Sequence, residues 1–437
     1  MSIKILTTAD LHLGKTSSSA DTIGEHGTTR NTWLKLVDYA IENDCRIIVI
    51  AGDIVEQENR YFEAVSALEK GLDKLKKHDV SIVLISGNHD YNVLPQIIEG
   101  RGYDHVHLLG KEGKWDTCVL DFEGLEVQFV GWSFTGRTYR KDPLENFDNT
   151  IIKSDLTTIG LVHGEYGLEE SNYAPLSLSS LVDANIDAWV MGHIHKPEIF
   201  QNSNPLIYYP GSPHALSSKE PGVHGPFVLK VSEYGIDDCN QIDFSPTRYE
   251  KFVIDVSDVQ NIENELERVL VEAQENFITN KIEYADTLEL LVLDVIFSGK
   301  THDLHQIDEF ILRDEYKDMI REIDGIKSSI RTIKNQCELK VKDLEKLSKE
   351  NSPAGLAAQA LIDLENNTDS EFLERIREEI NSSIRNLNTY GTYIPLRNSD
   401  TINQISENSE ELNELLKHEL NSFLSELLKT KETAVRA

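Results

Sequence analysis

The sequence is short of basic residues. It carries 43 lysines and arginines against 75 aspartates and glutamates, which gives a net charge of −32. Proteins bind the phosphate backbone of nucleic acids mainly through Lys and Arg, so this balance argues against a strong stand-alone nucleic-acid binder. It does not exclude a nucleic-acid substrate, because bound metal cations can supply a local positive field.

Cysteine and long apolar runs are also scarce. The four cysteines lie far apart and form no Cys-x-x-Cys pair, which favours reduced, buried thiols over a disulfide framework. No apolar run approaches the roughly 18 residues that a membrane span needs. The first residues resemble a β-strand and lack the layout of a signal peptide. We therefore expect a cytoplasmic protein without a membrane partner.

A chain of 437 residues is long enough for two or three domains. Its first 250 or so residues alternate short β-rich runs with helical patterns at Thr32–Asn43 and Tyr61–His78. Several of the runs are continuously apolar, as expected for strands covered on both faces. This alternation predicts a layered α/β fold. The predicted strands are Ile3–Ala9, Arg46–Ala51, Ser81–Ser86, Val127–Trp132, Ile159–His163, Ala188–Met191, Ile207–Tyr209 and Phe227–Val231.

The pattern changes after Tyr249. Strands at Lys251–Val256 and Leu288–Phe297, with helices from about Asn261 and Leu304, predict a small α+β unit. From about Ile307 onward the chain looks nearly all helical. We predict three parts: residues 1–248, residues 249–350 and a helical C-terminal arm at residues 351–437.

Potential metal ligands follow the predicted strands at the point where each strand ends. In open α/β sheets, ligands bind beyond the carboxyl ends of the strands, so five strand ends deliver oxygen and imidazole donors to one rim. Each motif alone is weak, but together and in this order they make a structural coincidence implausible. The donors are Asp10, His12, Asp53, Asn88, His163, His193 and His195.

These residue types suit a centre of two divalent metal ions, which needs a bridging carboxylate, further oxygen donors and neutral imidazoles. Asp53 is the natural bridge. One ion would then be completed by Asp10, His12 and His195, and the other by Asn88, His163 and His193. Four positive charges against two carboxylates leave a cationic site that favours phosphate.

The order Asp10-x-His12, Gly52-Asp53, Gly87-Asn88-His89-Asp90, His163 and Gly192-His193-x-His195 resembles the calcineurin-like metallophosphoesterase superfamily. The resemblance implies a four-layer αββα sandwich that holds two metals, usually Mn²⁺ in the nuclease branch, with Mg²⁺ as the alternative. It also implies that His89 is a catalytic histidine and not a ligand. That role is chemically sensible, because a histidine beside a ligand can protonate a leaving oxygen.

Three segments resemble SbcD-type nuclease subunits of DNA repair: Thr8–Gly14, Tyr209–Ser212 and Leu293–His305, the last of them in the family's capping domain. This resemblance implies exonuclease or endonuclease activity on DNA, with an SbcC-type coiled-coil ATPase as partner; a homodimer is left open. Glu56 departs from the family, which often has a second histidine or an aspartate there.

Two other functions stay open at this point. One is a phosphoesterase of the same superfamily that acts on nucleotides or other phosphoesters; the protein-phosphatase pattern Gly-Asp-x-x-Asp-Arg-Gly is missing after Gly52. The other is a catalytically silent scaffold, which the complete ligand set and His89 argue against. An assay for phosphodiester hydrolysis separates these functions.

Two further features have competing explanations. Arg137, Arg140 and Lys196 are candidate contacts to the substrate backbone, although solvated side chains would look the same. The leucine-rich stretch from Leu412 to Leu428 predicts a helix with one apolar stripe. That stripe either packs on the chain's own body or docks on the helices of a partner.

Overall fold

The protein was analysed as a computed structural model. By internal contacts the chain divides into two units, the first of which is Met1–Glu250, Ile282–Val292 and Glu322–Ser328. The second unit is Lys251–Lys281, Leu293–Arg321 and Ser329–Ala437. The residues that the structure describes are 1–15, 17–18, 27–56, 61–168, 170–259, 262–280, 287–301, 304–323, 325–340, 344–366, 368, 370–389 and 410–436.

Two six-stranded sheets form the body of the first unit. In each sheet the four inner strands, which carry the predicted apolar runs, pair mainly in parallel, and three of the four outermost strand pairs are antiparallel. The first sheet has the order β14 (Gly235–Gln241), β13 (Phe227–Ser232), β1 (Ser2–Thr8), β2 (Cys45–Ala51), β3 (Ser81–Ile85) and β4 (Val106–Leu108). The second has the order β11 (Glu198–Asn202), β12 (Leu206–Tyr209), β10 (Ala188–Gly192), β7 (Thr157–His163), β6 (Leu125–Trp132) and β5 (Asp116–Phe122).

The two sheets face each other across a shared apolar core. Ile47 and Val49 of β2 and Val83 of β3 pack in one buried cluster with Phe129 of β6 and Leu161 of β7. Because side chains alternate across a strand, the remaining apolar residues of these strands point to the outer faces. Helices therefore have to cover both outer faces, as the continuous apolar runs predicted.

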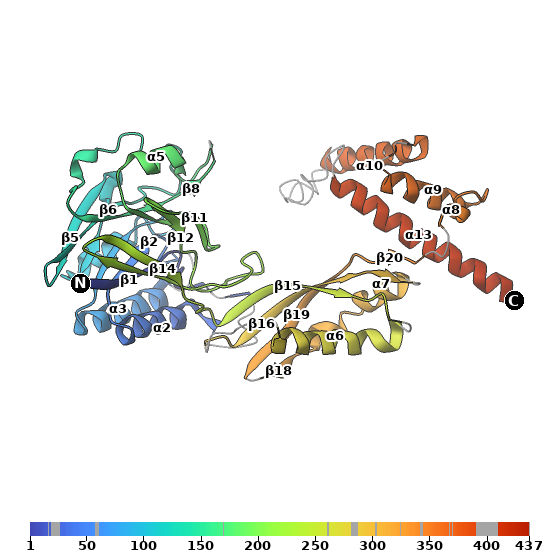
Figure 1. The fold of residues 1–437 in the computed structure, drawn as a ribbon, viewed down its shortest axis with the longest axis horizontal. Helices are drawn as coiled ribbons and strands as arrows, with labels where there is room; N and C mark the ends of the chain where they lie inside the picture. Colours follow the sequence, from blue (N-terminus) through green and yellow to red (C-terminus); the bar gives the residue numbers. More distant parts are fainter. Residues whose placement is uncertain are drawn as a thin grey trace. The chain divides into compact units, whose positions relative to one another are not determined.

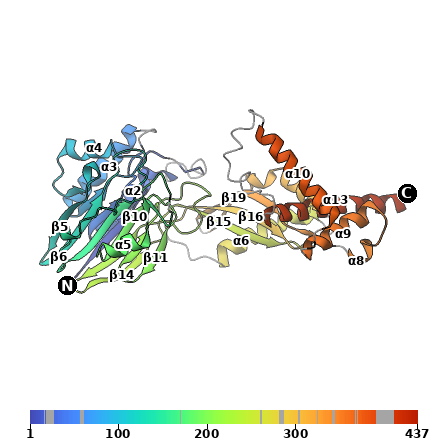
Figure 2. The same cartoon turned by 90° about the horizontal axis from the view of Figure 1, so that it is seen from above.

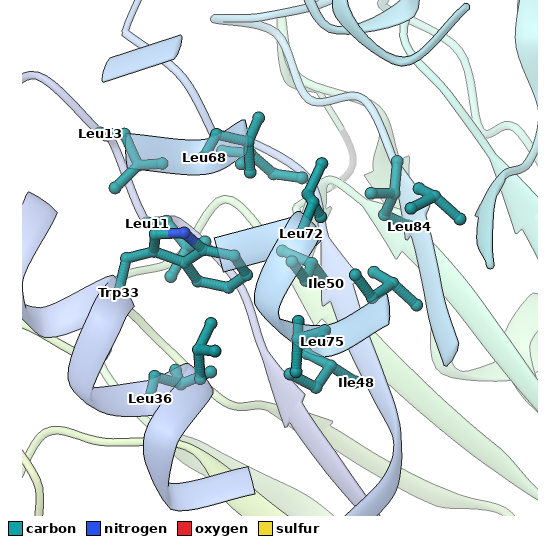
Figure 3. Packing of buried hydrophobic residues seen from close by; sticks show 14 of the residues in the cluster. Leu11, Leu13, Trp33, Leu36, Ile48, Ile50, Leu68, Leu72, Leu75 and Leu84 are labelled. Carbon is teal, nitrogen blue, oxygen red and sulfur yellow. The ribbon is translucent and has the colours of Figure 1, made fainter. Parts of the chain in front are cut away.

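The outer face of the first sheet is covered by α2 (Thr29–Glu42), α3 (Tyr61–Lys77) and α4 (Leu94–Arg101). Figure 3 shows this packing: Trp33 and Leu36 of α2 meet Leu68, Leu72 and Leu75 of α3 over strand residues such as Ile48 and Ile50. The indole of Trp33 donates a hydrogen bond to the Ala67 carbonyl at 3.0 Å, which joins the two helices.

The outer face of the second sheet packs against α5 (Leu178–Asp183) and the chain that follows it, through Leu181, Ala184 and Trp189. Figures 1 and 2 show α5 on the side of the first unit opposite α2 and α3. The four layers are thus helix, sheet, sheet and helix, which confirms the predicted αββα sandwich. Short elements lie in its loops: β8 (Glu165–Tyr166), β9 (Pro175–Leu176) and the 3-10 turns η2 (Lys111–Gly113) and η3 (Asn149–Ile151).

The second unit contains helices and most of the residues of a four-stranded sheet, whose remaining strand residues are assigned to the first unit. The sheet has the order β15 (Thr247–Asp255), β16 (Leu290–Ser298), β19 (Ile326–Asn335) and β18 (Arg321–Ile323), accompanied by α6 (Ile262–Asn280), α7 (Leu304–Leu312) and η4 (Glu315–Asp318). The expectation that the chain is nearly all helical from Ile307 is wrong. Buried and less buried residues alternate along β19, from Ile326 through Ser328 to Ile330, and this period of two is typical of a strand.

The C-terminal part is helical. It consists of α8 (Leu344–Leu347), α9 (Pro353–Glu365), α10 (Glu371–Thr389) and α13 (Glu410–Arg436), after a two-stranded ladder of β17 (Lys300–Thr301) and β20 (Glu338–Leu339). Figure 1 shows α13 alongside α9 and α10. Within the described residues, no helix is both long enough and apolar enough to cross a membrane.

Candidate metal centre

Two adjacent loops carry the first donors. The chain after β1 runs beside the chain after β2, and the Asp10 and His12 amides donate hydrogen bonds to the carbonyl oxygens of Gly52 and Asp53 at 3.1 and 3.0 Å. Asp10, His12 and Asp53 all have positive φ, at 51°, 42° and 49°. Such backbone is costly for residues with a side chain and is concentrated at functional sites. Here it turns three donor side chains toward one point.

The first donor group contains Asp10, His12 and His195. Their ligand atoms lie within 4.8 Å of one another, and His12 Nε2 is 3.1 Å from His195 Nε2. Asp10 also accepts the His193 amide at 3.1 Å, which ties the loop after β1 to the loop after β10. Asp53 Oδ2 lies 3.8 Å from His12 Nε2, so Asp53 reaches this group as well.

The second donor group contains Asp53, His163 and His193, again within 4.8 Å. Asn88 joins it, because its Oδ1 lies 3.1 Å from His163 Nε2 and 3.3 Å from His193 Nδ1. Asp53 Oδ2 is 3.4 Å from His163 Nε2. The structure therefore brings together all seven residues predicted as ligands, in two groups with Asp53 between them.

Each donor histidine has its other ring nitrogen engaged. His163 Nδ1 donates to the Ala51 carbonyl at 2.9 Å, and His195 Nδ1 lies 2.9 Å from Glu220. His193 Nε2 lies 3.2 Å from Glu165, and His12 Nδ1 lies 3.3 Å from Glu56. Such outer contacts fix the tautomer and orientation of a metal-binding imidazole. They leave one nitrogen of each ring directed at the donor groups.

The donor spacing fits divalent ions. Ligands at about 2.1 Å from one ion lie about 3 Å apart, and the closest pairs here are 3.1 to 3.4 Å apart. Glycines allow the donor loops to pack this closely. A Cβ on Gly87 would lie 2.1 Å from Asp53 Oδ1, and one on Gly192 would lie 1.9 Å from the Ala51 carbonyl oxygen.

Asp90, the last residue of the Gly-Asn-His-Asp motif, shapes the loop without joining the donors. It is fully buried and accepts the backbone amides of Gly87 and Ile54 at 2.8 and 2.7 Å. Burial, reinforced by the nearby charge of Asp53, raises the pKa of Asp90 to about 7. Asp90 therefore joins the loops that carry Asp53 and Asn88.

His89 stands next to the donors and pairs with Glu56. Its amide donates to Asp53 Oδ1 at 2.8 Å, and its ring Nδ1 lies 3.2 Å from Glu56 Oε1. The hydrogen bond to Glu56 raises the pKa of the His89 imidazole, against the opposing effect of burial. The second carboxylate oxygen, Glu56 Oε2, lies 2.9 Å from the Lys15 ammonium.

His12, Glu56 and His89 would themselves satisfy the spacing of a metal site. The Lys15 ammonium, however, already lies against Glu56 and 3.3 Å from His12 Nδ1. In this third group the Lys15 ammonium therefore takes the place that a metal cation would occupy. Glu56, whose role the sequence left open, connects a donor histidine to the histidine expected to be catalytic.

The three predicted substrate contacts are exposed side chains. Lys196 directly follows His195 and is exposed. Arg137 and Arg140 are exposed on the loop after β6, and Arg140 donates to Asn172 Oδ1 at 2.8 Å. The neighbouring Tyr173 ring lies on His193, with ring centroids 4.6 Å apart.

The carboxylates that contact the donor histidines from behind, Glu165 and Glu220, could not be predicted from the sequence. Glu165 lies two residues after His163, but Glu220 lies 25 residues after His195 in a loop that carries no motif. A carboxylate in so acidic a sequence gives no local signal. Only the folded chain places these two residues against histidine rings.

Comparison with known proteins identifies one domain. A family model described as calcineurin-like phosphoesterase matches residues 3–197, which confirms the expected calcineurin-like domain in this part of the chain. The chain is 25% identical over 233 residues to the uncharacterized metallophosphoesterase YhaO of Bacillus subtilis, with coverage of 52% of this chain and 55% of that protein.

Two archaeal relatives bear the name DNA double-strand break repair protein Mre11. The one from Methanopyrus kandleri is 27% identical over 288 residues, 60% of each chain, and the one from Nanoarchaeum equitans is 22% identical over 356 residues, 70% of this chain and 91% of that protein. This chain thus spans little more than half the length of YhaO and of the Methanopyrus protein.

Proposed function

We propose that this chain, in which residues 3–197 form a calcineurin-like phosphoesterase domain, is a two-metal phosphodiesterase that cleaves DNA. The domain supports the reaction class, a metal-dependent phosphoester hydrolysis. The two relatives named as DNA double-strand break repair proteins support DNA as the substrate.

The position of Asp53 carries the proposal. It is buried, lies between the two donor groups and also accepts the His89 amide. One carboxylate with these neighbours can hold two cations and at the same time fix the residue that acts on the substrate. A site for a single structural ion would have no use for the second donor group.

Asp10, His12, Asp53 and His195 would hold one ion, and Asp53, Asn88, His163 and His193 the other. Two divalent ions supply Lewis-acid activation and neutralise charge on the scissile phosphate when bound. We propose Mn²⁺ as the physiological ion, with Mg²⁺ as the alternative, since the resemblance to the nuclease branch implies Mn²⁺ and carboxylate donors suit both ions.

His89 is proposed to act on the leaving oxygen. It is 40% exposed at its side chain while Glu56 behind it is buried, so its free edge can reach substrate. The Glu56 carboxylate favours the protonated imidazole. A protonated His89 can donate its proton to the departing oxygen or stabilise the charge that develops there.

An SbcC-type ATPase is the proposed partner, and the C-terminal helices offer a surface for it. The apolar stripe predicted from Leu412 to Leu428 lies on α13 and is only partly covered. Leu412, Leu416 and Leu424 are buried, whereas Leu415 is 43% and Phe423 49% exposed. The exposed pair lines an apolar groove of about 530 Å³. Such a groove suits the apolar face of a partner helix. The other lining residues include Leu356, Phe372, Ile376 and Ile380.

The test is hydrolysis of single- and double-stranded DNA by the purified full chain with Mn²⁺, with and without the ATPase, beside a small phosphodiester. DNA cleavage that His89→Ala abolishes supports the proposal. Hydrolysis of the small diester without any cleavage of DNA would point to the nucleotide or other phosphoester class. No hydrolysis of either substrate, in a protein that binds two ions, would point to the silent scaffold.

A further inference from the structure

An aromatic cluster borders the metal centre on the side of the second donor group. Its buried part consists of Trp132, Phe134 and Ala174, with Tyr139 and Tyr173 partly buried against it. Phe134 meets the ring of His163 edge-on at 5.6 Å, and Tyr173 lies on His193 at 4.6 Å with an angle of 32° between the rings. Aromatic rings therefore reach two of the proposed metal ligands.

Two loops hold the tyrosines in place. Tyr139 and Tyr173 form a β-bridge, in which the Tyr139 amide donates to the Asn172 carbonyl at 2.7 Å and the Ala174 amide donates to the Tyr139 carbonyl at 2.6 Å. The Tyr139 ring also packs on the buried Trp132 at 4.8 Å. The rings are thus held by backbone pairing and by a buried indole, and little entropy would be lost when a ligand stacks on them.

Cations accompany these rings. Arg137, Arg140 and Lys141 are exposed on the Tyr139 loop, and the Arg140 side chain is oriented by its bond to Asn172. This concentration of positive charge stands out in a chain with a net charge of −32. The acidic Asp142 and Glu170 flank the two loops, so the positive charge is confined to the loop tip.

We infer that Tyr173 and Tyr139, with Arg140, form a subsite that stacks a nucleobase of the strand being cut and holds the phosphate next to it. The inference rests on the proposed function, since it assigns the substrate contacts of that same centre. Aromatic rings next to basic side chains are the usual platform for single-stranded nucleic acid, because every base offers a π-face and every linkage a phosphate.

The experiment is an abasic scan on single-stranded oligonucleotides with the full chain and Mn²⁺. Each oligonucleotide lacks one base at a different position, and kcat/KM is compared with that of the intact strand. One position near the cut should show a loss of about 5- to 150-fold, the range expected for one stacked base. Tyr173→Ala should remove the penalty at that position, and Tyr173→Phe, which keeps the ring, should retain it.

Two results would overturn the subsite. If no abasic position slows cleavage by the wild-type protein, the subsite is overturned without the need for any variant. An equal slowing of intact and abasic strands by Tyr173→Ala would show that this ring acts only by supporting His193. If the wild type cleaves no intact strand, the proposed function falls and the subsite falls with it; cleavage with a flat scan removes the subsite alone.

Arg140 has its own readout in the same assay. Arg140→Ala should raise KM on every oligonucleotide alike and reduce the slope of log affinity against log salt by about 1, as expected for one lost phosphate contact. An unchanged slope would remove Arg140 from the subsite.

Discussion

At the residue scale, Asp53 connects the parts of the centre. It is almost fully buried, and its pKa is held well below the usual range although burial opposes this, because His163 and His12 face it. Its carboxylate is therefore ionised at any working pH. A residue with this charge and these neighbours cannot be replaced by its amide without loss to both donor groups.

Asp53→Asn should weaken the binding of both metals, since the proposed bridge would lose its charge and one of its two carboxylate oxygens. The loss in affinity should exceed the roughly 10- to 100-fold that removal of an outer contact typically costs. His163→Ala is the matched comparison and should weaken chiefly one ion. Metal analysis of purified protein checks this. Two equivalents retained by Asp53→Asn together with full activity would contradict the assignment.

His89→Ala should lower turnover by about 100- to 10,000-fold, the usual contribution of general acid catalysis, and leave both metals bound. Its side chain contacts Glu56 and belongs to neither of the two donor groups, which together contain seven residues. Turnover within a few-fold of wild type would show that His89 only supports its neighbours. The same metal analysis separates loss of chemistry from loss of ions.

Glu56→Gln should move the alkaline limb of the pH–rate profile to lower pH. The carboxylate raises the pKa of His89, and a general acid loses activity as pH rises through its pKa. Without the carboxylate this pKa falls, so activity is lost earlier. Metal content must be measured alongside, because Glu56 also touches His12. If the variant binds both metal ions and its alkaline limb is unchanged, Glu56 does not set the pKa of the catalytic His89.

At the scale of elements, α13 has two faces with different tasks. Leu424 is fully buried, and Leu415 is 43% exposed on the same helix. Lys417 pairs with Glu338 at 3.0 Å, which ties the helix to β20. α13 is therefore anchored in its own unit along one face and open along another.

Leu424→Ala should lower the free energy of unfolding by about 2 to 5 kcal/mol, the usual cost of such a cavity. Leu415→Ser should change it by no more than about 0.5 kcal/mol but should weaken co-purification with the ATPase. Chemical denaturation and a pull-down measure the two effects. Undiminished partner binding by Leu415→Ser combined with Phe423→Ser would place the docking surface elsewhere.

At the scale of the whole molecule, the net charge of −32 should determine how tightly the chain binds DNA, its proposed substrate. A protein with six to ten phosphate contacts loses about 1,000- to 100,000-fold in affinity between 50 and 200 mM salt. The isolated chain, repelled by the polyanion outside the metal rim, should bind weakly and lose less than about 100-fold. Fluorescence anisotropy checks this, and addition of the ATPase should restore both affinity and salt dependence. A steep fall of DNA affinity with salt for the isolated chain would contradict this prediction and indicate a basic surface that the overall composition does not show.

The sequence by itself determined the sandwich and predicted which residues the fold brings together as donors. The apolar runs predicted the inner strands to within one or two residues, because strands buried on both faces need such runs. The donor residues could be found because each directly follows one of those strands. The edge strands β4, β5, β11 and β14 were missed, since each pairs with one neighbour only and none carries a long apolar run.

Tertiary structure decided the surroundings of the donors. Glu56, Glu165 and Glu220 touch donor histidines only because distant loops meet, and nothing in their local sequence differs from that of other acidic residues. The sequence also could not predict which apolar residues of α13 are buried and which are exposed. A heptad of leucines specifies an apolar face, but which of its residues are covered depends on the position of α9 and α10. The local sequence pattern therefore predicted the elements and the types of donor residue, and long-range packing determined which side chains contact the donors and which apolar residues of α13 stay exposed.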